Sequence, residues 1–274
     1  MHPSSNSESL PHHGYTGVGL TGVPLQLALP LLSKSRPALG LRLTRDPGMI
    51  SISNAVVEDG LGAWLELTQE CYKGTDNKSV AAYALSILAW RIGDILAGVY
   101  LIGARMPALS PADVSVAIFG RLGEPRDDID LLVHVSADSS GQSFDRAAFT
   151  QTTLALFENI VSALHLRTGL SIQAFWRIVT DGIAGGFVAH ARIDGNLARA
   201  KLEAAAILSS PKLHNRQWQI AEVWADGRRE WFRLRGGCCR YYRMPGGRKC
   251  SACVLHSRPI QIEKLQALVR QGET

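Results

Sequence analysis

The segment SVAAYALSILAWRIGDILAGVYLIGA, residues 79–104, is the most apolar long stretch of this 274-residue chain. It approaches the length that spans a membrane, but Arg91 and Asp94 stand at its centre, where each charge costs a few kcal/mol in lipid. The segment is therefore predicted to be a buried helix of a soluble protein, and no transmembrane segment is expected. A composition of 46% hydrophobic and 19% charged residues is that of an ordinary globular protein with a sizeable core.

The sequence on either side of this segment predicts a mainly helical body with a small β component, an α+β fold. Within residues 144–169, apolar side chains recur at steps of three and four, as on one buried face of a helix. Two β-branched runs, 114–120 and 129–135, are separated by a connection rich in Gly, Pro and Asp, and they predict a pair of strands. Further helices are predicted over residues 60–72, 172–192 and 197–208.

Residues 1–40 are rich in Ser, Pro, Gly and His and are predicted to be a flexible leader, because they show no sustained periodicity. They also lack the positively charged start and the apolar stretch of an export signal. The cysteines are therefore expected to meet a reducing cytoplasm rather than an oxidising compartment. The globular body is assigned to residues 41–215.

The character of the chain changes near residue 216, and residues 216–274 are predicted to form a separate C-terminal unit. The stretch 218–235 alternates bulky and polar residues around Asp226-Gly227, a pair favoured in tight hairpin turns. A final helix is predicted over residues 260–271, which carry one apolar face. The segment between the hairpin and this helix is therefore predicted to be a loop held at both ends.

That loop contains GGCCRYYRMPGGRKCSACVLHSR, residues 236–258, with four of the five cysteines of the chain. Two residues separate Cys250 from Cys253, a spacing that lets one turn aim both sulfurs at one centre, as in zinc and iron-sulfur sites. Ten residues separate Cys250 from the vicinal pair Cys238 and Cys239. The loop must therefore double back if all four sulfurs are to reach one metal centre.

Two glycine-containing segments are expected to shape this loop. Pro245-Gly246-Gly247 is predicted to reverse the chain. Neighbouring side chains of extended backbone point apart, so the vicinal cysteines need a local kink, which Gly236 and Gly237 are predicted to allow. A vicinal pair fits the tetrahedron of a single zinc ion less well than usual, whereas a two-iron cluster offers more separated attachment points.

Basic residues surround the cysteines, and an anionic metal centre would be stabilised by them. Four thiolates and two sulfides around two ferric ions leave a net charge of about −2, which becomes about −3 on reduction. The cations inside the loop are predicted to favour the reduced form and to attract an anionic substrate. They are Arg240, Arg243, Arg248 and Lys249. A zinc site with four thiolates has a similar formal charge, so the electrostatics leave both kinds of metal site open.

The pattern of two adjacent cysteines, ten residues, a cysteine, two residues and a last cysteine, with Tyr242 and a Pro-Gly turn inside it, resembles the FhuF family of ferric-siderophore reductases. The resemblance implies that Cys238, Cys239, Cys250 and Cys253 hold a 2Fe-2S cluster, which receives an electron and passes it to ferric iron chelated by a siderophore in the cytoplasm. It further implies a body that docks the siderophore, and an electron donor that is a ferredoxin, a flavoprotein or a small reductant.

Some residues leave other interpretations open. Val254 stands where a proline often follows the last cysteine of that family, which concerns the exit of the loop rather than its ligands. A rival interpretation is a zinc-binding four-cysteine module that contacts nucleic acid or a protein partner, whereas the reductase needs no nucleic acid. Another keeps the cluster as a redox or iron sensor. Cys71 is interpreted as a buried apolar residue and His256 as an exposed loop residue.

Overall fold

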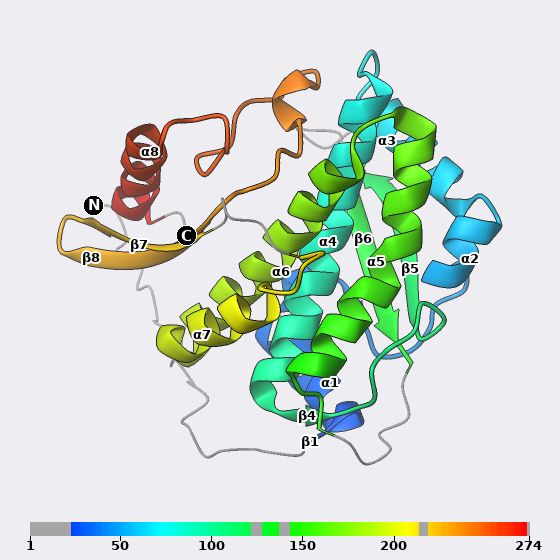
Figure 1. Cartoon of the computed structure of the whole chain (residues 1–274), viewed down its shortest axis with the longest axis horizontal. Helices are drawn as coiled ribbons and strands as arrows, with labels where there is room; N and C mark the ends of the chain where they lie inside the picture. The colour runs from blue at the N-terminus through cyan, green and yellow to red at the C-terminus, as the bar shows by residue number, and fades with distance from the viewer. Residues whose placement is uncertain (1–22, 122–127, 137–142, 214–218, 273–274) are drawn as a thin grey trace, which may run out of the picture.

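The computed structural model describes residues 23–121, 128–136, 143–213 and 219–272. The central element of the body is helix α4, Asn77–Ile102, which lies among the other helices (Figure 1). Among the described residues, α4 is the one helix long and apolar enough to cross a membrane, but 72% of its most apolar window is buried inside the protein. The segment is therefore a buried core helix of the globular body, as predicted.

The two charged residues at the centre of α4 are both paired. Arg91 Nη2 lies 2.6 Å from Asp130 Oδ1. Asp94 is fully buried, forms an ion pair with Arg36, and places its Oδ1 2.8 Å from His190 Nε2. Because each charge has a partner, the helix buries them without the large cost of an isolated charge.

Helix α6, Ile172–Asp194, packs against α4 so closely that the two backbones touch. A Cβ atom at Gly182 would lie 2.3 Å from the carbonyl oxygen of Ala89, and one at Gly186 would lie 2.3 Å from the carbonyl oxygen of Gly93. Glycine is required at these positions because any side chain would push the helices apart. The contact fixes the position of the middle of α6 relative to the body.

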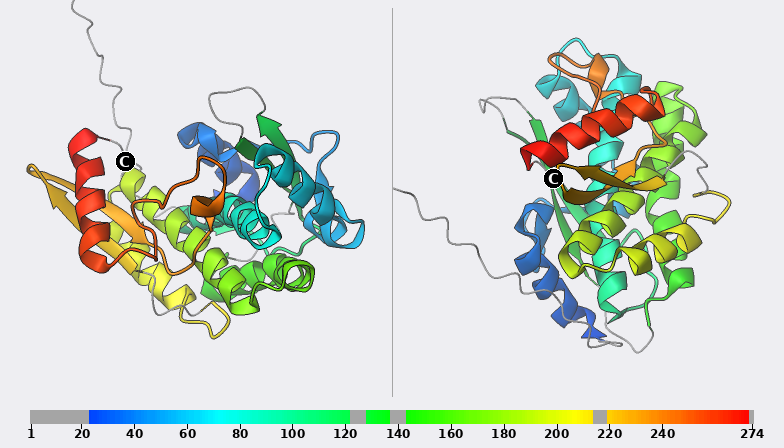
Figure 2. Two further views of the ribbon diagram at one scale, coloured as in Figure 1. Left: turned by 90° about the horizontal axis from the view of Figure 1, so that it is seen from above. Right: turned by 90° about the vertical axis from the view of Figure 1, so that its left-hand side faces the viewer.

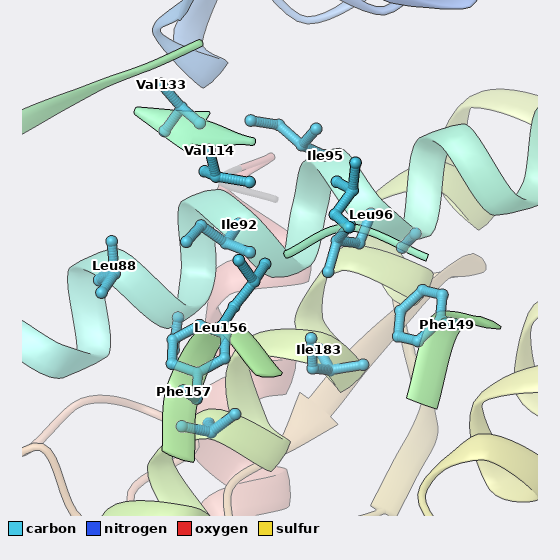
Figure 3. Close-up of a cluster of buried hydrophobic side chains, with 14 of the residues drawn as sticks. Leu88, Ile92, Ile95, Leu96, Val114, Val133, Phe149, Leu156, Phe157 and Ile183 are labelled. Carbon is cyan, nitrogen blue, oxygen red and sulfur yellow. The ribbon is translucent and has the colours of Figure 1, made fainter. Parts of the chain in front are cut away.

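The remaining core is made by helices α3, Gly60–Cys71, and α5, Arg146–Thr168, with the short helices α2, Ile52–Val57, and α7, Leu197–Ile207. The predicted periodicity of α5 is confirmed, since its apolar side chains are buried against α4 and α6. Figure 3 shows part of this core, to which Phe149, Leu156 and Phe157 of α5, Ile92 of α4 and Ile183 of α6 contribute side chains.

A four-stranded sheet covers one side of the helices, in the order β2, β6, β5, β3. Strands β5, Val114–Arg121, and β6, Asp128–Val135, are antiparallel, which confirms the predicted pair. The short strands β2, Leu41–Arg42, and β3, Ile50–Ser51, extend it at either edge. Two further short strands, β1, Val23–Pro24, and β4, Ala104–Arg105, pair in parallel. The fold is α+β and mainly helical, as predicted.

The prediction of a flexible leader up to residue 40 is wrong from residue 23 onward, while residues 1–22 lie outside the described residues. Helix α1, Leu25–Ser35, and a 3-10 turn, η1, Pro37–Leu39, follow β1. Leu25 and Leu32 are each 1% exposed and belong to the main core. Pro30 lies inside α1 and removes one helical hydrogen bond, but the apolar burial of α1 outweighs that loss.

The C-terminal unit contains a hairpin of β7, Gln219–Ala225, and β8, Arg228–Leu234, followed by the cysteine loop and helix α8, Arg258–Gln271. At the turn, Asp226 and Gly227 have φ of 50° and 74°, as a two-residue hairpin turn of type I′ requires. Helix α8 lies across the hairpin (Figure 2) and shares with it a small core of its own. The hairpin and the last helix are confirmed, whereas the boundary at residue 216 stays a prediction.

Candidate metal centre

The cysteine loop leaves strand β8 against the middle of α6. The amide groups of Gly236 and Gly237 donate to the two carboxylate oxygens of Asp181, at 2.8 and 2.9 Å. A Cβ atom at Gly237 would lie 2.7 Å from the carbonyl carbon of Arg177, so the chain approaches the helix backbone as closely as a glycine allows. The first residues of the loop are therefore fixed to a buried carboxylate of the body.

The kink at the vicinal cysteines lies after them rather than before them. Arg240 adopts the left-handed conformation, with φ of 58°, whereas neither Gly236 nor Gly237 has a positive φ. The prediction that these two glycines make the kink is thus wrong, because they serve the close approach to α6. The amide of Arg240 is hydrogen-bonded to the sulfur of Cys238, and the left-handed turn brings this amide back toward the first cysteine.

The predicted reversal of the loop is confirmed at Pro245-Gly246-Gly247. The amide of Gly247 donates to the carbonyl oxygen of Met244 at 2.8 Å, and Gly246 has φ of 69°. Proline at the second position and glycine with positive φ at the third are typical of a type II turn. This turn follows the short 3-10 helix η2, Tyr241–Arg243. Figure 1 shows the chain passing through η2 beside α4 and returning to α8.

The last two cysteines are connected by a tight turn. The amide of Cys253 donates to the carbonyl oxygen of Cys250 at 3.0 Å. The carbonyl oxygen of Cys253 accepts from the amide of His256 at 3.0 Å and from Gln261 Nε2 at 2.7 Å. Cys253 is buried, while Cys250 is half-buried. Helix α8 therefore holds this second pair from the other side of the loop.

The four thiols lie in one neighbourhood, and all of them are in the part of the chain that the structure describes. None of them forms a disulfide. Burial raises the pKa of the Cys238 thiol, the Arg240 amide lowers it, and a charge on Cys239 raises it again. Burial also raises the pKa of Cys250, Arg235 lowers it, and charges on Cys239 and Cys253 raise it. The thiols thus oppose one another's ionisation, so they favour binding positive ions together.

The described residues contain no three Cys, His, Asp or Glu side chains arranged to hold a single metal ion. The preference for a centre wider than a single zinc ion therefore rests on the spacing of the cysteines in the sequence.

A separate observation tests whether the site fits an anionic cofactor. Arg235, whose side chain is 13% exposed, lies with Nη1 3.3 Å from Cys239 Sγ and 3.9 Å from Cys250 Sγ, and with Nε 3.5 Å from Asp181 Oδ2. Arg233 donates to the main-chain oxygen of Asp181. The Nε atoms of both arginines are out of contact with solvent and have no hydrogen-bond partner among the described residues.

These charges do not balance. Two guanidinium groups face one carboxylate, so at least one positive charge is left over beside the sulfurs even when Asp181 is ionised. Burial lowers the pKa of Arg235, but the negative charges of Cys239, Asp181 and Cys250 raise it above its ordinary value. A buried charge without a partner is unfavourable, so a negative group bound by the cysteines would stabilise the site. A cluster ligated by thiolates supplies one, so the residues fit a 2Fe-2S cofactor.

Among the described residues, none of the four cations predicted to stabilise the cluster is hydrogen-bonded to a sulfur through its side chain. Arg240 Nε donates to Ser79 Oγ at 3.0 Å, and Arg243 Nε lies 3.2 Å from Asp76 Oδ2, so both bind the N-terminal end of α4. Arg248 and Lys249 are exposed, and neither has an ion pair among the residues that the structure describes. The interpretation of these four residues as neighbours of the cluster stays a prediction.

Aromatic packing adds a further attachment of the loop to the body. Tyr241 stacks on Tyr83 of α4 with the ring centroids 5.2 Å apart. It also makes an edge-to-face contact with Tyr72, with the ring centroids 6.2 Å apart. Met244 packs into the same apolar cluster, together with Cys71. Cys71 is 9% exposed, which confirms its interpretation as a buried residue beside the apolar core. His256 is half-buried rather than exposed.

The residues that the sequence analysis missed are Arg233, Arg235, Asp181 and Asp76. One signal in the sequence could have revealed Asp181, since it is a carboxylate directly before the glycines of a helix that is otherwise apolar there. Arg233 and Arg235 precede the first cysteine, so the spacing of the cysteines gives no indication that they lie beside the loop.

The site belongs to the class of thiolate-ligated metal centres. Its four thiols lie together in one loop of an α+β protein, beside a buried excess of positive charge. Residues 235–255 match the model of a protein family described as the FhuF 2Fe-2S C-terminal domain. The match begins at Arg235, includes all four cysteines of the loop, and confirms the predicted resemblance to the FhuF family. The 2Fe-2S cluster predicted from the sequence is the cofactor for which this domain is named. No curated protein matches the chain.

Proposed function

We propose that this protein is a cytoplasmic ferric-siderophore reductase. The observation that carries the proposal is the match to a 2Fe-2S domain over a loop in which four thiols lie together beside unbalanced positive charge. Cys238, Cys239, Cys250 and Cys253 would hold the cluster, which supplies a one-electron carrier when bound.

The chemistry requires one electron for each iron. Siderophores hold Fe(III) through hard oxygen donors, and Fe(II) binds such donors more weakly. One electron from the reduced protein converts chelated Fe(III) to Fe(II), and the chelator is released unchanged. The protein returns to its oxidised state and takes one electron from a ferredoxin, a flavoprotein or a small reductant. No side chain has to donate or accept a proton in this exchange.

The residues of this chain support such an exchange in two ways. Cys238, Cys239 and Cys250 are half-buried, so the sulfurs lie close to the protein surface, where a bulky chelate can approach them. The exposed side chains of Arg248 and Lys249 stand directly before Cys250 and attract an anionic chelate or donor to this place.

Anaerobic purification tests the proposal. The purified protein is expected to contain iron and acid-labile sulfide, to absorb in the visible range and to bleach on addition of dithionite, with an electron paramagnetic resonance signal in the reduced state. Ferric chelates added to the reduced protein should restore its absorption as Fe(II) appears. Protein that contains zinc and lacks acid-labile sulfide would refute the proposal.

A further inference from the structure

One arginine connects the sulfurs of the loop with the body. Arg235 reaches Cys239 and Cys250, which belong to the two different halves of the loop, through a single nitrogen, Nη1. Its Nε lies 3.5 Å from the carboxylate of Asp181, which also binds the amides that lead into the loop. Among the described residues, Arg235 is the cation whose side chain is hydrogen-bonded to sulfurs of the loop.

We propose that Arg235 is a positioning residue that stabilises the reduced state of the 2Fe-2S centre, and that Asp181 holds its guanidinium in place. This inference rests on the proposed function, because it concerns the same cofactor. It adds a role for two residues, one of which lies in α6, outside the span that matches the family model.

The physical reason is the change of charge on reduction. A 2Fe-2S centre with four thiolates goes from about −2 to about −3, so a nearby cation stabilises the reduced state more than the oxidised state. Asp181 has the opposite charge and therefore opposes the effect. Arg235 is mostly shielded from water, so its field is screened less than that of an exposed cation.

The other cations of the region are placed less favourably for this role. Arg240 and Arg243 are partly neutralised by Asp76 at the end of α4. Arg248 and Lys249 are exposed, so water and salt screen them. Arg233 is held by the main chain of Asp181. Arg235 is thus the cation whose removal should change the midpoint potential most.

The experiment compares midpoint potentials of the loaded, full-length protein by anaerobic redox titration, followed by absorption and electron paramagnetic resonance. The variants are Arg235→Gln, which removes the charge, Arg235→Lys, which keeps it, and Asp181→Asn, which removes the opposing charge. Arg228→Gln is the matched control, since Arg228 is exposed at the far end of β8, about 20 Å along the strand from the loop.

Arg235→Gln is expected to lower the ratio of reduced to oxidised protein about tenfold at the midpoint of the unmodified protein, which is a shift of about 59 mV for a one-electron couple. Arg235→Lys should shift it less, and Asp181→Asn should shift it in the opposite direction. Opposite shifts from the two members of one pair are not produced by loss of structure. The control should titrate with the unmodified protein.

Two results would overturn the inference and leave the proposed function intact. One is an iron-sulfur protein in which Arg235→Gln and Arg228→Gln have the same midpoint. The other is Asp181→Asn with an unchanged or lowered midpoint potential. This second result tests the inference even if Arg235→Gln does not retain iron and sulfide. Failure of the proposed function would be visible earlier, as a purified protein without acid-labile sulfide.

Discussion

The arginines that precede the first cysteine and the cations inside the loop differ in what they face. Arg233 and Arg235 point to Asp181 and, in the case of Arg235, to two sulfurs. The loop cations bind the end of α4 or extend into solvent, as Arg243 and Lys249 do. The two groups are close in sequence, and each of their side chains carries one positive charge. From this difference we expect burial, rather than nearness in sequence, to decide which cation acts on the proposed metal centre.

The largest effect is expected from the four cysteines, because they would bind the cluster directly, whereas the cations of both groups act on it only through their charge. Replacing any one of Cys238, Cys239, Cys250 and Cys253 by serine should abolish or greatly reduce the iron and acid-labile sulfide content and the reduction of ferric chelates. Cys71→Ser is the matched control and should retain both. Unchanged visible absorption in the Cys238 and Cys239 variants would show that the vicinal pair is not part of the ligand set.

The second largest effect is expected from Asp181, which contacts Arg233 and Arg235. Asp181→Ala leaves two loop amides and the Arg235 guanidinium without their carboxylate, so the free energy of unfolding should fall by about 3–5 kcal/mol. Urea unfolding of the purified protein measures this loss. A smaller loss, equal to that of Asp76→Ala, would show that the contacts of Asp181 stabilise the protein no more than the contacts of Asp76 do.

The attachment of the loop cations should matter less. Asp76 caps α4 through Ser79 and pairs with Arg240 and Arg243, all near the surface. Asp76→Ala is expected to lower the free energy of unfolding by about 1 kcal/mol, mainly through the lost cap. Iron and sulfide content should be unchanged, and Asp76→Asn, which restores a capping side chain, should recover most of the stability.

The smallest effect is expected from the exposed cations. The double variant Arg248→Gln, Lys249→Gln should reduce an anionic ferric chelate a few-fold more slowly than the unmodified protein at low salt. The difference should disappear at about 0.5 M salt, where such charges are screened. A neutral ferric chelate is the control and should show no difference at either salt concentration. A changed midpoint potential in this variant would contradict the comparison.

The long periodic segments of the fold could be predicted because the spacing of their apolar residues indicates which face is buried. Helix α5 and the hairpin around Asp226 were predicted in this way, whereas α4 was predicted from the length of its apolar stretch. Helix α1 was missed because Pro24 and Pro30 are local signals against a helix, whereas the apolar face that stabilises it finds its partners only in the folded core.

The candidate site divides in the same manner. The cysteine spacing and the turn at Pro245 are local and were predicted. The left-handed residue is Arg240, a type of residue that seldom adopts that conformation, so local propensity indicated the neighbouring glycines instead. The contact of Arg235 with Asp181 joins positions far apart in the chain, and no local pattern specifies such a pair.

Asp181 directly precedes Gly182, the residue at which α6 has no room to move toward α4. The carboxylate that binds the start of the loop therefore belongs to one of the least compressible points of the protein. An electron carrier mounted there keeps its surrounding dipoles nearly still when its charge changes, which lowers the reorganisation energy of each transfer. If the proposed electron transfer is correct, the tight crossing of α4 and α6 would therefore favour fast electron exchange.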